Sequence, residues 1–144
     1  MPEKCVDASV AVKWVVKGEP WRTKARKLLQ DSQTAGFTLI APPMFEYETE
    51  TVVQGLLMNG VLSVSEADTA LAQVAAANVQ LLTHSDMVSR ARDFARRFHQ
   101  RRIYDALYAA LADLRGCEFW TADTAFCNDV SPSLPFVRHI RFYP

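Results

Sequence analysis

The sequence predicts an α/β domain built on a mainly parallel central sheet of four to five strands. Short, β-like apolar runs alternate along the chain with longer stretches of helical periodicity, which is typical of strands joined by crossover helices. The chain has 144 residues, of which 49% are hydrophobic and 22% charged, so it is long enough to bury a core of its own. We therefore expect residues 1–144 to form one domain.

Each expected element comes from one of these runs. Strands are predicted at residues 5–6, 38–41, 79–82, 118–121 and 137–140. Helices are predicted at residues 8–17, 20–33, 43–59, 65–77, 85–100 and 103–115, with a short helix after Asp123. No repeat, linker or low-complexity segment interrupts this alternation.

Several helix boundaries carry start or stop signals. Pro43 suits a first helical position, because the first turn of a helix has no internal partner for its N–H groups. Ser65 with Asp68, and Thr83 with Asp86, have the residue types expected of capping boxes, in which side-chain oxygens satisfy such N–H groups. Glycines that accept the left-handed conformation stand where three helices are expected to end, at Gly18, Gly60 and Gly116.

Composition excludes several classes of protein. The 16 basic and 16 acidic residues cancel, so the chain lacks the net charge of a general nucleic-acid binder. Its basic residues nevertheless cluster, which indicates either a spatial separation of charge or a solvated helix face. The cluster contains Arg90, Arg92, Arg96, Arg97, Arg101 and Arg102.

The three cysteines, Cys5, Cys117 and Cys127, are far apart and lack CxxC spacing, so we expect reduced thiols and neither disulfides nor zinc. No stretch approaches the roughly 20 apolar residues of a membrane span, and the N-terminus lacks the apolar centre of a signal peptide. We expect a cytoplasmic protein that does not associate with membranes.

Four acids stand at positions where a carboxylate is unexpected. Asp7 directly follows the first predicted strand and Asp123 closes the fourth, and in isolation a helix N-cap explains each of them. Glu48 lies on an otherwise apolar helical face, whereas Glu46 and Glu50 read as solvent-facing acids. Asp105 lies on a packed helical face, although an acid in a first helical turn is also favoured by the helix dipole.

These four acids can meet, because ligands of a parallel sheet bind beyond the carboxyl ends of its strands. A cluster of carboxylates repels itself unless a divalent cation sits among them, and ligands that are all oxygen favour Mg²⁺ or Mn²⁺ over zinc. Carboxylate-held magnesium suits phosphodiester hydrolysis, which predicts a nuclease. The three histidines, His84, His99 and His139, lie at none of the predicted strand ends and receive no chemical role.

Four motifs occur in order along nearly the whole chain: VDASVAVKW at 6–14, Ala41-Pro42 followed by Glu48, YDALY followed by Leu111-Ala112 at 104–112, and TAD at 121–123. Together they resemble the motifs of PIN-domain nucleases, in particular the VapC-type toxins of bacterial toxin–antitoxin pairs. The resemblance implies a three-layer α/β/α sandwich that binds Mg²⁺ or Mn²⁺ and cleaves single-stranded RNA, leaving 3′-hydroxyl and 5′-phosphate ends.

On this resemblance, Asp7, Glu48, Asp105 and Asp123 correspond to the catalytic, metal-binding acids. Ser9 and Thr121 match accessory hydroxyl positions. The toxins of this family usually form homodimers, and an antitoxin silences them by inserting its C-terminal segment into the acidic groove. A homodimer on a helical surface is also suggested by an apolar run longer than one buried face requires, although a core helix explains it as well. That run contains Val52, Val53, Leu56, Leu57, Met58, Val61 and Leu62.

The sequence departs from the family pattern at two places. Thr51 replaces a frequent asparagine three positions after the glutamate, and Phe126 and Cys127 occupy positions where some members carry a further acid, so a second metal site is in question. Two alternatives remain within the fold: a stand-alone PIN nuclease of RNA processing without an antitoxin, and a non-catalytic RNA-binding protein. A phosphatase-like hydrolase is disfavoured, since a nucleophilic DxD arrangement is absent at Asp7-Ala8-Ser9.

Overall fold

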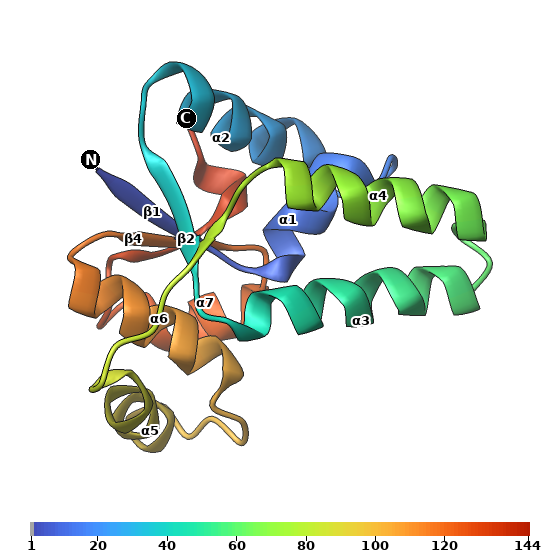
Figure 1. Ribbon diagram of the computed structural model, residues 1–144. Coiled ribbons are helices and arrows are strands. Elements are labelled where there is room, and N and C mark those ends of the chain that lie inside the picture. The colour runs from blue at the N-terminus through green and yellow to red at the C-terminus, as the bar shows by residue number, and fades with distance from the viewer. Residues whose placement is uncertain (1) are drawn as a thin grey trace.

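The computed structural model describes residues 2–144 and contains a five-stranded sheet whose neighbouring strands all run parallel (Figure 1). The order of the strands is β3-β2-β1-β4-β5. The fold class and the upper limit of the expected strand number are therefore confirmed. The strands are β1 (Glu3–Val6), β2 (Thr38–Ala41), β3 (Gln80–Leu81), β4 (Glu118–Thr121) and β5 (Val137–His139).

Helices cover both faces of the sheet and make the three layers. In Figure 1, α1 and α2 lie on one side of the sheet and α6 with α5 on the other, while α3 and α4 form a hairpin that extends away from it. Within residues 2–144, no helix combines the length and hydrophobicity needed to cross a bilayer. The helices are α1 (Ala8–Val15), α2 (Arg22–Thr34), α3 (Met44–Met58), α4 (Val64–Ala76), α5 (Met87–Arg97), α6 (Tyr104–Arg115) and α7 (Thr124–Val130), followed by a 3-10 turn at Ile140–Phe142.

The main core lies between the sheet and its two helical layers. Tyr108 of α6 stacks on Phe119 of β4 with ring centroids 5.5 Å apart, and Trp120 beside it is fully buried. A smaller cluster that includes Val12 of α1 and Val53 of α3 joins the first helix to the α3–α4 hairpin. This second cluster fixes the position of α3 relative to the carboxyl end of β1, from which α1 starts.

The capping box predicted at Ser65 and Asp68 is wrong, because the helix begins one residue earlier than expected. Ser63 is the N-cap of α4, and its hydroxyl accepts from the N–H of Glu66 at 3.1 Å. In return, the Glu66 carboxylate accepts from the N–H of Ser63 at 2.9 Å. The motif therefore exists two residues upstream of its expected place.

The capping box predicted at Thr83 and Asp86 is also wrong. Asp86 is the N-cap of α5 but makes no side-chain capping bond, and its own N–H donates to His84 Nδ1 at 3.0 Å. Pro43 is the N-cap of α3 and not its first helical residue. By contrast, the three glycines predicted at helix ends all have positive φ, and the C-cap of α6, Gly116, has φ 67°.

Candidate active site

The strand order places a ligand site at the carboxyl ends of β1 and β4. The chain runs from β1 to β2 and β3 on one side and then crosses to β4 and β5 on the other, so its direction of progress reverses between β1 and β4. In open parallel sheets a crevice forms beyond the strands at such a switch point, and ligands bind there. Asp7 directly follows β1, and Asp123 lies two residues after the end of β4.

Asp7 is a buried helix N-cap whose two carboxylate oxygens both accept hydrogen bonds. Oδ1 accepts from the Ser9 hydroxyl at 2.5 Å and from the N–H of Val10 at 3.2 Å, while Oδ2 accepts from the Thr121 hydroxyl at 2.5 Å. Burial raises the pKa of Asp7, these three donors oppose that rise, and the charge of Asp123 adds to it. The carboxylate is therefore held in one orientation at the switch point.

Ser9 and Thr121, the two accessory hydroxyls of the sequence prediction, connect the ends of the two strands. Besides donating to Asp7, the Ser9 hydroxyl accepts from the N–H of Ala122 at 2.9 Å. The Thr121 hydroxyl likewise accepts from the N–H of Asp123 at 3.1 Å. Each hydroxyl thus holds Asp7 and the segment after β4 in a fixed mutual position.

Asp123 caps the helix that follows it. Its Oδ1 accepts from the N–H of Phe126 at 2.9 Å, which is the N-cap bond of α7. The side chain is half-buried, and its carboxyl group lies close enough to that of Asp105 to raise the pKa of Asp105. The expected N-cap is confirmed, and the same carboxyl group meets a second acid.

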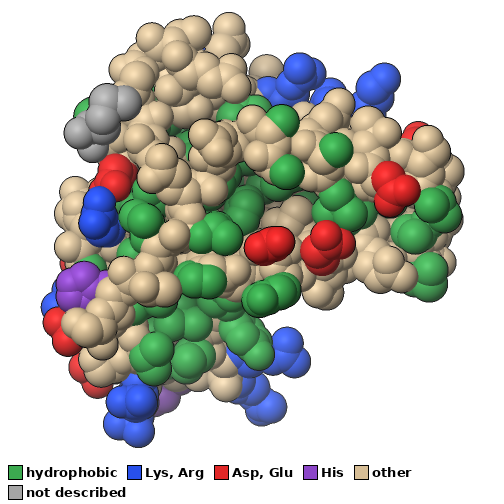
Figure 2. Space-filling view, in the orientation of Figure 1, with side chains coloured by type: hydrophobic (Ala, Val, Ile, Leu, Met, Phe, Trp, Pro, Cys, Tyr) green, Lys and Arg blue, Asp and Glu red, His purple; other side chains and the backbone are tan. Residues whose placement is uncertain are grey.

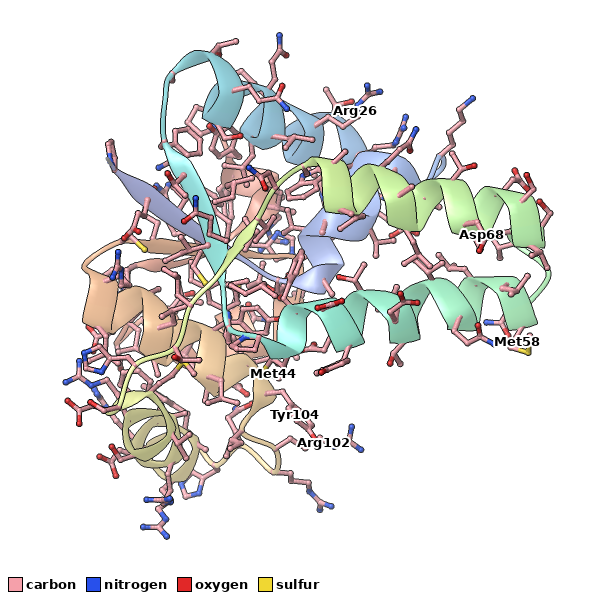
Figure 3. All side chains as sticks on the ribbon, in the orientation of Figure 1. Arg26, Met44, Met58, Asp68, Arg102 and Tyr104 are labelled. Atoms are coloured by element: carbon pink, nitrogen blue, oxygen red, sulfur yellow. The ribbon has the colours of Figure 1, made fainter. Side chains whose placement is uncertain are left out.

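Asp105 lies in the first turn of α6, whose N-cap is Ile103, so it is not the capping residue. Burial raises the pKa of Asp105 to about 8, and the neighbouring carboxyl groups of Asp123, Asp7 and Glu48 add to this rise. All four predicted acids thus act on one another at this edge of the sheet. Figure 3 labels the starts of the two helices that bring Glu48 and Asp105 there, at Met44 and Tyr104.

Glu48 lies on the inward face of α3, as its helical spacing predicted. It is half-buried, whereas Glu46 and Glu50 are exposed. Its Oε1 and the hydroxyl of Tyr108 are both buried and make no hydrogen bond of good geometry. Burial raises the pKa of Glu48 and the charge of Asp7 adds to this, although the nearby Tyr108 hydroxyl favours the charged form.

A divalent cation suits this set of residues, although the side chains do not surround one as they stand. Among residues 2–144, no three histidine, cysteine, aspartate or glutamate side chains are grouped closely enough to hold a metal ion. However, a buried carboxylate oxygen without a partner, such as Oε1 of Glu48, needs a cation or a donor. The other donors of the cluster are carboxylates as well, which are the ligands that Mg²⁺ and Mn²⁺ prefer.

The departures from the family motif have different structural consequences. Thr51 is exposed and donates to the carbonyl of Tyr47 in its own helix at 2.9 Å, so this hydroxyl does not orient Glu48. Phe126 and Cys127 are buried. They belong to the core and add no ligand beside Asp123.

Sequence reasoning missed His139, because the predicted last strand ran one residue too far. His139 is the final residue of β5 and lies at the same sheet edge as the acids. It is 2% exposed, its Nε2 lies 3.1 Å from the Thr124 hydroxyl, and its Nδ1 accepts from the N–H of Arg141 at 3.1 Å. Burial and the charge of Arg141 lower its pKa. The useful signal was its place at the carboxyl end of a parallel strand.

Side chains of both charges lie on the surface of the molecule. Figure 2 shows acidic side chains near the centre of one face, beside apolar ones, and both basic and acidic side chains around its rim. Arg90 of the basic cluster pairs with Asp113 of α6 at 2.7 Å. Arg92, Arg96 and Arg97 of α5 are exposed, which fits the alternative interpretation of a solvated helix face.

Comparison with known proteins gives a family and two structural relatives. The sequence pattern of the PIN domain matches residues 4–128. No curated protein matches the sequence. The crystal structure of PAE2754 from Pyrobaculum aerophilum is similar with a TM-score of 0.69 at 16% identity, covering 97% of this chain and 92% of that one. VapC20 of Mycobacterium tuberculosis, a toxin that cleaves the sarcin–ricin loop, has a TM-score of 0.63 at 19% identity, covering 94% and 98%.

Proposed function

This chain belongs to the PIN-domain family, and we propose that it is a Mg²⁺- or Mn²⁺-dependent endoribonuclease that hydrolyses phosphodiester bonds of single-stranded RNA. PIN domains are typically nucleases that use a divalent metal. The observation that carries the proposal is the mutual effect of four carboxylates at the switch point, where Asp105 has a pKa of about 8. A fold does not by itself assign an activity, but perturbed acids clustered at a ligand-binding edge favour one.

Asp7, Glu48, Asp105 and Asp123 would hold the cation. When bound, a divalent ion supplies positive charge that lowers the pKa of a water nucleophile and stabilises the leaving oxygen of the phosphodiester. The protein contributes orientation, since Ser9 and Thr121 hold Asp7 in place before any ligand arrives. Such preorganisation matters because a misplacement of about 1 Å in a catalytic site costs on the order of a hundredfold in rate.

Asp105 also has to lose its proton before it can serve as an anionic ligand. With a pKa of about 8 it is largely neutral at neutral pH in the free protein. A cation among the four acids favours their charged forms, so metal binding and proton release are coupled. We therefore expect metal affinity to rise with pH up to about 8.

We also propose that the protein is the toxin of a VapBC-type toxin–antitoxin pair, with a cognate antitoxin and a second copy of itself as partners. The structural similarity to VapC20 supports this, although at 19% identity it establishes the fold alone. A short open reading frame for a DNA-binding protein beside the gene, whose product copurifies with the chain and inhibits it, would be the expected finding. Activity without such a neighbour would favour a stand-alone nuclease of RNA processing.

The test of the activity is a cleavage assay on a pool of single-stranded RNAs, with the product ends mapped. We expect cleavage in Mg²⁺ or Mn²⁺ that leaves 3′-hydroxyl and 5′-phosphate ends, and none in EDTA, because all proposed ligands are oxygen atoms. Full cleavage in chelator, with no metal bound, would contradict the proposal. Metal binding measured by calorimetry without RNA separates a failure of the metal site from the choice of an unsuitable RNA.

A further inference from the structure

A second group of side chains lies beside the acids and has no part in the chemistry described so far. Three side chains form this group. Lys13 of α1 contacts Trp21, which precedes α2, and Trp21 contacts His139 at the end of β5. The Trp21 and His139 rings meet edge to face with centroids 4.6 Å apart, and the Lys13 ammonium lies 5.6 Å from the centre of the Trp21 ring. We call these three residues the flanking cluster.

The flanking cluster is continuous with the acidic cluster. On α1, Ser9 and Lys13 are four residues apart, which places them on one helical face about 6 Å apart along the axis. Ser9 donates to Asp7. On the other side, His139 contacts the hydroxyl of Thr124, and Thr124 directly follows Asp123. The flanking cluster therefore adjoins the acids at two places, through α1 and through the start of α7.

Lys13 is a buried cation with few partners. It is 5% exposed, and among residues 2–144 its ammonium makes one hydrogen bond, which is a long contact of 3.5 Å to Oε1 of Glu19. An ammonium carries three donors, and burying a charge is costly unless strong acceptors surround it. Lys13 therefore has unused capacity for an anion, and the Glu19 carboxylate partly occupies the place of one.

Trp21 has a backbone conformation that is sterically unfavourable for a residue with a large side chain. Its backbone is left-handed, with φ 57° and ψ 23°, which is an outlier for a bulky aromatic residue. The side chain nonetheless remains 39% exposed. A flat aromatic ring held at the surface, next to a buried ammonium, is the pair of groups with which proteins bind a base and its phosphate in single-stranded nucleic acid.

We infer that the flanking cluster is a subsite for the RNA nucleotide next to the cleaved bond, in which the base stacks on Trp21 and its phosphate replaces Glu19 at Lys13. This inference rests on the proposed ribonuclease activity, whose acids it extends. His139 is the positioning residue of the subsite, since its ring nitrogens are occupied by Thr124 and Arg141 and its edge supports Trp21. The subsite also explains how a chain with no net charge and an acidic site can hold an anionic substrate.

The first test removes the charge of Lys13. Lys13→Met keeps the apolar stem, and Lys17→Met, at an exposed position just beyond the end of α1, is the control for loss of one positive charge. We expect Lys13→Met to raise the KM for single-stranded RNA about tenfold more than the control does, with kcat within about threefold of the wild type. The dependence of log affinity on log salt should also become shallower by about 0.7, the value for one phosphate contact on a single strand.

The second test separates stacking from packing at Trp21. An apolar packing role is satisfied by leucine as well as by phenylalanine, whereas stacking requires a ring. We expect Trp21→Leu to weaken binding of a single-stranded oligonucleotide by about fivefold or more, and Trp21→Phe to retain most of it. Equal affinities of these two variants, both folded as judged by melting temperature, would overturn the stacking assignment.

The third test removes the charge of Glu19. The expected RNA affinity of Glu19→Gln depends on whether the Glu19 carboxylate only pairs with Lys13 or occupies the place of the RNA phosphate. If the Glu19 carboxylate occupies the phosphate position, Glu19→Gln should bind RNA a few-fold more tightly than the wild type. Asp68→Asn, on α4 at the position labelled in Figure 3, is the control for loss of one negative charge. Glu19→Gln that binds RNA no better than Asp68→Asn would contradict the phosphate assignment.

All binding measurements use fluorescence anisotropy with an oligonucleotide in EDTA, so they do not depend on cleavage. A wild type that cleaves RNA, with Lys13→Met and Trp21→Leu behaving like Lys17→Met, would overturn the subsite and leave the proposed activity intact. A wild type that binds RNA through these residues without cleaving it in any metal would overturn the proposed activity and leave the flanking cluster as an RNA-binding site only. Failure of the wild type to bind RNA in EDTA would overturn the subsite, and failure to cleave RNA in Mg²⁺ or Mn²⁺ as well would overturn both.

Discussion

The exchange Asp105→Asn tests the acidic cluster most directly, because it removes one charge and keeps the size of the side chain. Asp105 has a pKa of about 8, against an ordinary pKa of 3.8 for an aspartate, since it is buried and faces three other acids. Between these two pH values the folded protein holds a proton that the unfolded chain has released. The free energy of unfolding therefore falls as pH rises through this window, and the full loss is present above about pH 8.

Each pKa unit corresponds to about 1.36 kcal/mol, and the partial exposure of Asp105 reduces the total, so we expect a loss on the order of a few kcal/mol. Asparagine cannot ionise, so the variant should lose less stability than the wild type between pH 5 and pH 8.5. The assay is chemical denaturation in EDTA at both pH values. Asp68→Asn, at an exposed position of α4, is the control for loss of one carboxylate and should behave like the wild type.

In magnesium the wild type should be stabilised more than Asp105→Asn. A ligand that binds only the folded state stabilises it, so saturating Mg²⁺ should raise the melting temperature of the wild type at pH 8.5 more than that of Asp105→Asn. RNA cleavage by Asp105→Asn should fall by about a hundredfold or more, since the remaining acids hold the cation less firmly and less well aligned. Identical pH profiles of the two proteins in EDTA would refute the crowding of carboxylates, and cleavage at the wild-type rate would place Asp105 outside the reaction.

Two further predictions concern α3. Glu48→Gln should bind Mn²⁺ more weakly in calorimetry yet leave the metal-free protein at least as stable, since it relieves repulsion, whereas Glu46→Gln and Glu50→Gln should change neither property. A dispensable Glu48 beside an essential Glu46 or Glu50 would show that the inward face is misassigned. We also expect a homodimer through apolar side chains that the α3–α4 hairpin exposes, such as Tyr47 (73% exposed) and Met58 (69% exposed). Light scattering that finds only monomer at high concentration would contradict it.

The predicted apolar run of α3 shows why sequence alone left the dimer open. Val53 is 2% exposed and belongs to the cluster that joins α3 to α1, whereas Met58 and Val61 are 69% and 56% exposed. Helical spacing identified an apolar stretch, but the number of neighbours that cover it depends on where α4 and α1 pack. Val53 is therefore a core residue, whereas the exposed residues of the run leave the homodimer a prediction.

Other features depended on packing between distant segments and could not be read from spacing. Helix α1 is buried nearly all round, so no amphipathic face indicated where Lys13 points. Its burial depends on α2, α3 and α4, which follow α1 in the sequence and pack against it. For His139, an error of one residue in the end of a strand decided whether it lay inside the sheet or at the functional edge.

The position of the four acids at one edge of the sheet was predictable from the sequence. At the ends of β1 and β4, the residue that caps the next helix also lies at the candidate site. Asp7 and Asp123 were each weighed as a helix cap or as a site residue, yet a carboxylate has two oxygens that can serve different partners. In Asp123, Oδ1 accepts the capping bond of α7 while the carboxyl group also meets Asp105. In Asp7, the capping bond from Val10 and the two hydroxyl bonds fix the group at the strand end. A cap at the end of a parallel strand thus orients a carboxylate toward the crevice, so cap residues at such ends are stronger candidates for site residues.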